Sequence, residues 1–155
     1  MDEEEKPSPM IFVQEPKHLA FSRDIIHCHP YLRERWPGLM ALYQEDTGHD
    51  LFLTCTWRSV KEQQKLYNQG RMGNPGPIVT MVDGINRRSN HNPYPARAFD
   101  VAVDIDADFK KVKVSWDISL YLPLGRICHQ LGLEWGGNFS TIKDYPHIEV
   151  PKEVV

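Results

Sequence analysis

Two histidines lie close to carboxylates, in two separate stretches of the chain. His91 belongs to segment 89–100 (SNHNPYPARAFD), which ends at Asp100, and His147 belongs to segment 144–149 (DYPHIE). Imidazole nitrogens and carboxylate oxygens are ligands that suit Zn²⁺, and a set of three leaves one coordination position open for water, as in catalytic zinc sites. The spacing alone also allows a second interpretation, in which these are loop histidines beside ordinary surface acids.

The other histidines favour structural roles. His27 and His29 flank Cys28, but residues two apart on a helix do not face the same way, so this trio is a poor chelate. The three cysteines are odd in number and form no Cys-x-x-Cys pair, so we expect no disulfide framework. The remaining histidines are isolated in the sequence: His18, His49 and His129.

In order and residue type, these stretches resemble the M15 family of zinc peptidases. The family comprises D-Ala-D-Ala carboxypeptidases and dipeptidases, and phage or bacterial L-alanyl-D-glutamate endopeptidases. Its pattern is Ser-x-His, a short loop, Ala-x-Asp, and later Trp-Gly-Gly followed by (Asp/Glu)-x-x-His. Here these blocks read SNH (89–91), AFD (98–100), WGG (135–137) and DYPH (144–147), after an arginine-bearing turn, TWRS (56–59).

The resemblance implies a zinc peptidase with one Zn²⁺ per chain. His91, Asp100 and His147 match the metal ligands of the family. Asp144 matches the general base, which takes a proton from water and passes it to the leaving amine. Arg58 matches the residue that donates hydrogen bonds to the oxyanion.

Further residues are candidates for contact with the substrate: Ser89, Trp57, Trp135 and Arg97. Core packing is the alternative for the two tryptophans, and a loop cap is the alternative for Ser89. Glu149 is expected to hydrogen-bond a metal-binding histidine. A basic cluster that either attracts substrate carboxylates or forms a solvated face comprises Arg87, Arg88 and Arg97.

The loop between the first histidine and the aspartate departs from the common family form. Eight residues separate His91 from Asp100, where the common form has six with a glycine among them. Pro93 and Pro95 stand in place of that glycine. We expect the extra residues to bulge from the loop before the strand, so that both ligands still reach one ion.

The implied reaction is hydrolysis of an amide bond in the stem peptides of bacterial peptidoglycan. The phage-type endopeptidase branch is the most similar, so we predict an L-alanyl-D-glutamate endopeptidase of lysin type. One alternative is a D-Ala-D-Ala carboxypeptidase or dipeptidase. Another is a non-catalytic, zinc-stabilised binding module, although such a module needs neither Asp144 nor Arg58.

The start of the chain and its charge bear on location and partners. The sequence opens with the acidic stretch MDEEEKPSPM, where a secretory signal would be basic and then apolar. We therefore expect synthesis in the cytoplasm without a signal peptide, and action on the cell wall after phage-mediated lysis or another route of release. A net charge of −3 argues against a nucleic-acid binder, and no apolar run is long enough to span a bilayer. We expect a monomer whose partner is a peptidoglycan peptide.

Strands and helices must bring these residues together. Short apolar runs predict strands at 51–56, 99–105, 133–135 and 147–150. Helical patterns cover 22–43, with breaks near Pro30 and Pro37, and 117–132, weakened by Pro123. Pro37 is predicted in the first turn of a helix that ends at Gly48.

A further helix and a long loop complete the pattern. A capping box, Ser59 to Glu62, opens a helix that ends near residue 69, and a loop rich in Gly, Pro and Asn covers 71–96. Without a regular strand–helix–strand rhythm, the order predicts an α+β fold with a small antiparallel sheet flanked by helices. The resemblance implies the fold shared by hedgehog proteins and D-Ala-D-Ala zinc peptidases. The chain has 155 residues, 41% of them hydrophobic, and we predict one domain over residues 11–155 after a flexible acidic tail at 1–10.

Overall fold

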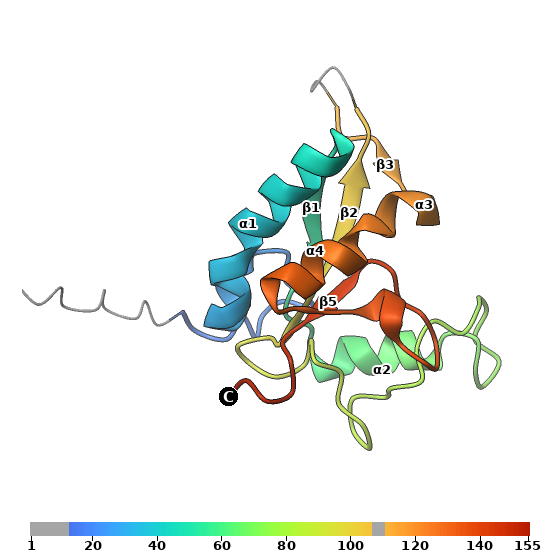
Figure 1. Ribbon diagram of the computed structural model, residues 1–155. Helices are drawn as coiled ribbons and strands as arrows, with labels where there is room; N and C mark the ends of the chain where they lie inside the picture. Colours follow the sequence, from blue (N-terminus) through green and yellow to red (C-terminus); the bar gives the residue numbers. More distant parts are fainter. Residues whose placement is uncertain (1–12, 107–110) are drawn as a thin grey trace, which may run out of the picture.

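A five-stranded antiparallel sheet lies at the centre of the fold (Figure 1). The computed structural model describes residues 13–106 and 111–155, so the acidic tail predicted at 1–10 lies outside the described residues. The strands run in the order β1-β2-β5-β4, and β3 pairs with the far end of β2. Their bounds are β1 Asp50–Cys55, β2 Ala98–Asp104, β3 Val114–Ser115, β4 Glu134–Trp135 and β5 His147–Glu149.

Two helices, α1 and α4, pack against each other and cover one face of the sheet (Figure 1). Their buried side chains meet the sheet in a continuous apolar core, in which Trp36 packs edge-on against Phe99 with ring centroids 5.3 Å apart. The predicted α+β fold, a small antiparallel sheet flanked by helices, is confirmed. The helical segments are η1 Ile25–His27, α1 Pro30–Thr47, α2 Val60–Asn68, α3 Ile118–Tyr121, α4 Pro123–Leu131 and η2 Gly136–Asn138.

The alternation of side chains along β2 gives the sheet two different faces. Phe99, Val101 and Val103 point into the apolar core, so Asp100 between them points to the opposite face. In β5, Ile148 belongs to the core, and therefore His147 points to the same face as Asp100, which pairs with it in register. The face opposite α1 and α4 consequently carries the polar side chains.

A β-bulge in β1 turns one more side chain to the polar face. Leu53 pairs with Val101 and Cys55 pairs with Asp100, so two steps along β1 correspond to one step along β2. Leu53 packs against the core, and strict alternation would place Cys55 there too. The bulge instead directs the Cys55 thiol toward His91, 3.8 Å from its Nδ1 atom.

The prediction that Pro37 opens a helix is wrong. Pro30 lies in the first turn of α1, and the helix continues through Pro37 to Thr47. An internal proline costs a helix about 3 kcal/mol, but Trp36 and Leu39 on either side are buried in the core, and this packing keeps the helix intact. Gly48, with φ +75°, ends α1 as predicted.

The segment predicted as one helix at 117–132 forms two. Asp117 caps the single turn of α3 through its bond from the Ser119 amide, and Pro123 begins α4. The fixed φ of a proline suits the first turn of a helix, which explains why α4 starts there. Within the described part of the chain, no helix combines the length and the hydrophobicity that a bilayer span needs.

Alanine substitutions at two glycines are expected to change stability in opposite directions. A Cβ at Gly136 would lie 2.2 Å from the carbonyl oxygen of Asp144, whereas a Cβ at Gly38, inside α1, meets only Leu131 Cδ2 at 3.8 Å. We expect Gly136→Ala to lower the free energy of unfolding by about 1–3 kcal/mol, because the backbone of the Asp144 turn must move. Gly38→Ala should raise it by about 0.5–1 kcal/mol, because alanine restricts the unfolded chain.

Urea denaturation of both variants at one protein concentration measures these differences. A Gly136→Ala variant as stable as the parent protein would contradict the close approach of Gly136 to the backbone of Asp144.

Candidate active site

Three side chains from distant parts of the sequence meet on the polar face of the sheet. His91 Nε2 and His147 Nδ1 each lie 3.2 Å from the same oxygen, Oδ1 of Asp100. The centroids of the two imidazole rings are 5.1 Å apart. The extra residues of the loop do not separate His91 from Asp100. They are held against the N-terminal segment instead, where Ala96 forms a bridge with Cys28.

The outward nitrogen of each ring has its own acceptor. His91 Nδ1 donates to the carbonyl oxygen of Thr56 (2.7 Å), and His147 Nε2 donates to Oε1 of Glu149 (3.0 Å). These bonds fix the ring orientations and leave one nitrogen of each ring directed at Asp100. Both histidines are buried.

The charges of this trio depend on one another, and a metal ion that binds both rings must displace their protons. Burial alone would lower the pKa of both imidazoles, but Asp100 raises the pKa of His91 to about 10, and Asp100 with Glu149 raises that of His147 to about 9. The two rings in turn lower the pKa of Asp100 against the effect of its burial. A carboxylate thus faces two groups that prefer to carry positive charge.

The donor set fits a divalent metal ion. Ligands about 2.0–2.2 Å from a tetrahedral zinc lie roughly 3.3–3.6 Å from one another, which is close to the 3.2 Å separations here. Two groups offer ligand atoms within 4.8 Å of one another, and Asp100 belongs to both: Cys55 with His91 and Asp100, and Asp100 with Asp144 and His147. We therefore identify this cluster as a candidate metal site.

Arg58 lies beside the trio and is held at both ends. Its backbone N–H donates to the carbonyl oxygen of His91 (2.9 Å), and Asn92 Nδ2 donates to its carbonyl oxygen (3.1 Å). The guanidinium Nη2 is 3.6 Å from Asp100 Oδ2, and Nη1 donates to Gln63 Oε1 (2.9 Å). The side chain is thus a fixed cation next to the candidate metal site.

Asp144 also lies beside the trio. Its Oδ2 atom is 3.9 Å from His147 Nδ1, and its side chain is 51% exposed. Partial desolvation and the nearby Asp100 carboxylate raise the pKa of Asp144. Its backbone N–H donates to the carbonyl oxygen of Gly136 (3.0 Å), which fixes the turn before His147.

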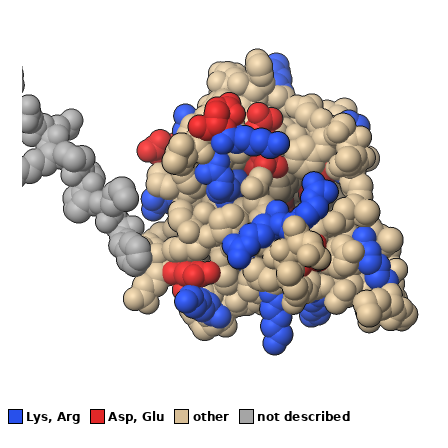
Figure 2. Space-filling view, turned by 90° about the horizontal axis from the view of Figure 1, so that it is seen from below, with Lys and Arg blue, Asp and Glu red and all other residues tan. Residues whose placement is uncertain are grey.

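These groups line a cleft of about 660 Å³. One wall is the segment 79–82 together with α2, and the other is the segment 139–144. Arg87, Arg88 and Lys143 also line the cleft, so it combines cations with the carboxylates beside the histidines. Seen from below, basic side chains cross the surface of the molecule, with acidic side chains partly visible between them (Figure 2).

Comparison with known proteins agrees with this arrangement. A peptidase M15 family model, described as D-alanyl-D-alanine carboxypeptidase, matches residues 83–150. The chain is 34% identical over 131 residues to the peptidoglycan L-alanyl-D-glutamate endopeptidase CwlK of Bacillus subtilis (strain 168), covering 79% of this chain and 72% of CwlK. This chain belongs to the M15 peptidase family.

The fold of this M15 peptidase also has a solved counterpart. The crystal structure of the Serratia marcescens L-Ala D-Glu endopeptidase ChiX matches with a TM-score of 0.54 and 21% sequence identity, covering 81% of each chain. At that level of identity, the likeness supports the common fold. The family match at 83–150 includes His91, Asp100, Asp144 and His147, whereas Arg58 lies before it.

The predicted substrate-binding residues of this M15 peptidase occupy different places. Ser89 lines the cleft, and its Oγ accepts from the backbone N–H of His91 (3.2 Å), so it also caps the loop. Trp57 and Trp135 are buried in the apolar core and do not line the cleft. Arg97 Nη2 donates to the carbonyl oxygens of Pro151 and Val154, away from the cleft.

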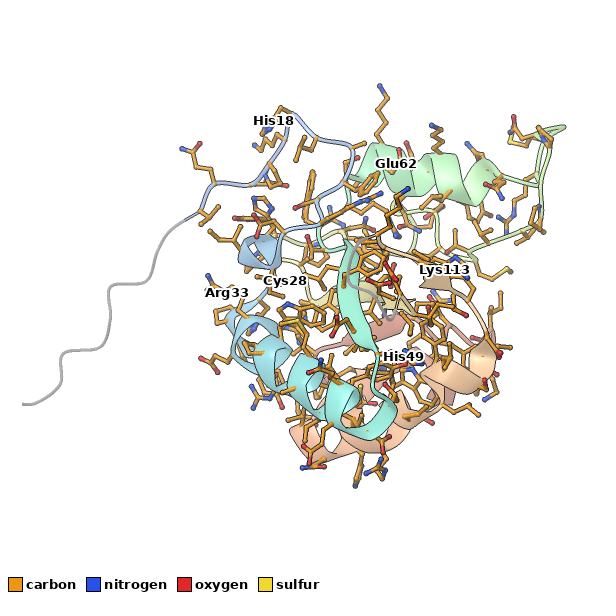
Figure 3. The ribbon with its side chains drawn as sticks, turned by 90° about the horizontal axis from the view of Figure 1, so that it is seen from above. His18, Cys28, Arg33, His49, Glu62 and Lys113 are labelled. Carbon is orange, nitrogen blue, oxygen red and sulfur yellow. The ribbon has the colours of Figure 1, made fainter. Side chains whose placement is uncertain are left out.

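The histidines that the sequence analysis set aside have other contacts. His27 Nδ1 pairs with the Ser22 hydroxyl at 2.6 Å, so it does not join Cys28. His18 lies in the N-terminal segment and His49 at the junction of α1 and β1 (Figure 3).

Sequence reasoning missed two buried residues of this site. Cys55 contacts His91 and receives a hydrogen bond from Arg58 Nη2 (3.5 Å). Gln63 accepts from the same guanidinium. No role was predicted for either residue, although the position of Gln63 five residues after Arg58, at the start of a helix, placed it within reach.

We predict that His147→Ala loses most of its metal affinity, because one of the three converging donors disappears. His49→Ala removes an imidazole outside the cluster and should keep full metal content. After dialysis of both variants and the parent protein against zinc and then against buffer, elemental analysis gives zinc per chain. Full occupancy in His147→Ala would remove this residue from the ligand set.

Proposed function

We propose that this chain is a zinc-dependent L-alanyl-D-glutamate endopeptidase acting on the stem peptides of peptidoglycan. The observation that carries the proposal is the convergence of two imidazole nitrogens on one Asp100 oxygen, beside Arg58 and Asp144 in one cleft. CwlK, to which 79% of the chain aligns, is a peptidoglycan L-alanyl-D-glutamate endopeptidase, and this supports the choice of bond.

His91, Asp100 and His147 would hold the zinc ion, one per chain. Their nitrogen and carboxylate donors suit Zn²⁺, and the hydrogen bonds to Thr56 and Glu149 keep each ring in the tautomer that presents a lone pair. Glu149 thus orients a ligand. When bound, zinc supplies Lewis acidity at the scissile amide.

Asp144 would act as the general base. A carboxylate here can accept a proton from the attacking water and deliver it to the nitrogen of the leaving amine, which breaks the C–N bond. The raised pKa of Asp144 supports this role, because a carboxylate whose pKa is closer to neutral is a stronger base toward the attacking water. Its half-exposed side chain faces the cleft without contacting Arg58 in the described structure.

Arg58 would stabilise the charge that develops on the carbonyl oxygen of the scissile amide. Its guanidinium carries a permanent charge, and the bonds to Gln63 and Cys55 hold it in place before the substrate arrives. A donor that is already oriented requires little reorganisation during the reaction, which favours the transition state over the ground state.

The rim of the cleft suits an anionic peptide. D-Glutamate has two carboxyl groups, and at most one of them continues the peptide chain, so the residue after the scissile bond keeps a negative charge. Arg87, Arg88 and Lys143 line the cleft and would attract this charge, while Ser89 offers a hydroxyl on the same side.

A second candidate function is D-Ala-D-Ala carboxypeptidase or dipeptidase activity. It is favoured by the description of the family model that matches residues 83–150. It would use the same zinc ligands, and only the walls of the cleft would differ. A zinc-stabilised binding module accounts less well for the site, because structural zinc needs no base at Asp144 and no oriented cation at Arg58.

The proposed substrate places the action of the protein at the bacterial cell wall. We infer that it works there as a monomer, reaching the wall after phage-mediated lysis or by another route of release. A neighbouring holin gene would support the phage origin, and neighbouring genes of cell-wall recycling would contradict it.

Digestion of purified peptidoglycan tests the bond that is cleaved. The zinc-loaded protein should release peptides with new N-terminal D-glutamate, detected by mass spectrometry after labelling of free amines. Free D-alanine or the D-Ala-D-Ala dipeptide would instead indicate the second candidate function. Peptidoglycan that binds the protein but releases nothing would favour the binding module.

We predict that Asp144→Asn keeps its zinc and loses turnover by about 10²–10⁴-fold, because the amide cannot accept the proton. Asp46→Asn is the matched control, since Asp46 pairs with an exposed arginine, Arg126, on the surface. Its turnover should equal that of the parent protein. If Asp144→Asn retains full turnover with bound zinc, another group is the base.

A further inference from the structure

Gln63 is a buried glutamine that contacts no reacting atom. It lies in the first turn of α2, with 1% of its surface exposed. A buried side-chain amide costs free energy unless its oxygen and nitrogen both find partners. The partners of Gln63 therefore indicate why a glutamine occupies this place.

Both ends of the amide are bonded to the active-site cleft. Gln63 Oε1 accepts from Arg58 Nη1 at 2.9 Å, and Nε2 donates to the carbonyl oxygen of Val82 at 2.9 Å. The backbone N–H of Gln63 donates to the carbonyl oxygen of Ser59 (3.0 Å), inside the capped start of α2. The side chain thus connects the guanidinium to the wall of the cleft through a fixed helix.

The wall is packed closely against the same side chain. Gly84 has φ +82°, and a Cβ at this position would lie 3.1 Å from both Cβ and Cγ of Gln63. The chain therefore passes directly over Gln63 where it leaves the wall segment 79–82. This contact and the bond to Val82 hold the wall and the amide in one arrangement.

Without Gln63, the guanidinium would have a competing partner. Arg58 Nη2 lies 3.6 Å from Asp100 Oδ2, a separation that allows attraction but is too long for a hydrogen bond. The bond from Nη1 to Gln63 draws the guanidinium away from this carboxylate. A guanidinium released from Gln63 could close on Asp100 and no longer point at the carbonyl oxygen of a substrate.

We propose that Gln63 is a positioning residue, which aims the Arg58 guanidinium at the scissile carbonyl and fixes it relative to the wall segment 79–82. This inference rests on the proposed role of Arg58 as the donor to the oxyanion. Gln63 itself touches no reacting atom. It acts by keeping Arg58 in the geometry that stabilises the transition state.

A double-mutant cycle with zinc-loaded protein and a stem-peptide substrate tests the proposal. Gln63→Met keeps the size of the side chain and removes both bonds, so kcat should fall by about 10–100-fold with KM within about twofold and zinc retained. In the Arg58→Ala background, the same substitution should change kcat by less than about twofold. Gln64→Met makes the same chemical change one residue further along α2, outside the cleft lining, and should leave kcat and KM unchanged.

The outcomes distinguish a failure of the role proposed for Gln63 from a failure of the role proposed for Arg58. An equal loss of kcat in both backgrounds, or a change in KM alone, would show that Gln63 has only a structural role. If Gln63→Met loses zinc or fails to fold, Gln63→Asn repeats the cycle with a shorter amide that cannot reach Arg58, with the same expected losses. Unchanged kcat in Arg58→Ala would overturn the role of Arg58 itself, whereas a normal loss there and unchanged kcat in Gln63→Met would overturn only the role of Gln63.

Discussion

A single carboxylate oxygen organises the polar half of this protein. Two imidazole nitrogens face Asp100 Oδ1 at 3.2 Å, from a loop before β2 and from β5. Charged groups taken out of water need close partners, and each member of this trio has them on every side. The acceptors of Thr56 and Glu149 orient the rings, and Arg58 lies beyond the second oxygen of Asp100.

The sheet makes this concentration of charge compatible with a stable core. Alternate residues of β2 and β5 pack under α1 and α4, and Asp100, His147 and Glu149 form the floor of the cleft. The same two short strands therefore supply both apolar packing and two of the three proposed metal ligands, Asp100 and His147. The bulge in β1 adds Cys55 to the polar face at the level of Asp100.

The walls of the cleft are built differently from its floor. The floor belongs to strands, whereas the wall segment 79–82 has no regular structure and is fastened to α2 by side chains. Gln63 bonds to Val82, and Arg71 Nη1 donates to the carbonyl oxygen of Thr80 (3.0 Å). An irregular wall held by such bonds keeps a defined shape next to the proposed metal ligands, which suits the proposed binding of a peptide in one orientation.

The sequence by itself determined the chemistry of the site and the class of fold. Asp100 and His147 lie in β2 and β5, and local residue patterns are enough to predict short strands, turns and caps such as Ser59. The M15 resemblance carried by the blocks around these residues agrees with the family match. Local patterns failed at Pro37, because the burial of Trp36 and Leu39 outweighs the preference of proline for a helix start.

Only the tertiary structure decided which side chains face the cleft. Tryptophans such as Trp57 and Trp135 are common in peptide-binding surfaces, but both are buried in the apolar core here. The direction of the Cys55 side chain depends on a bulge between two strands, which no pattern within β1 contains. The bonds of Gln63 reach five residues back and nineteen residues forward, and contacts of that kind exist only once the chain has folded.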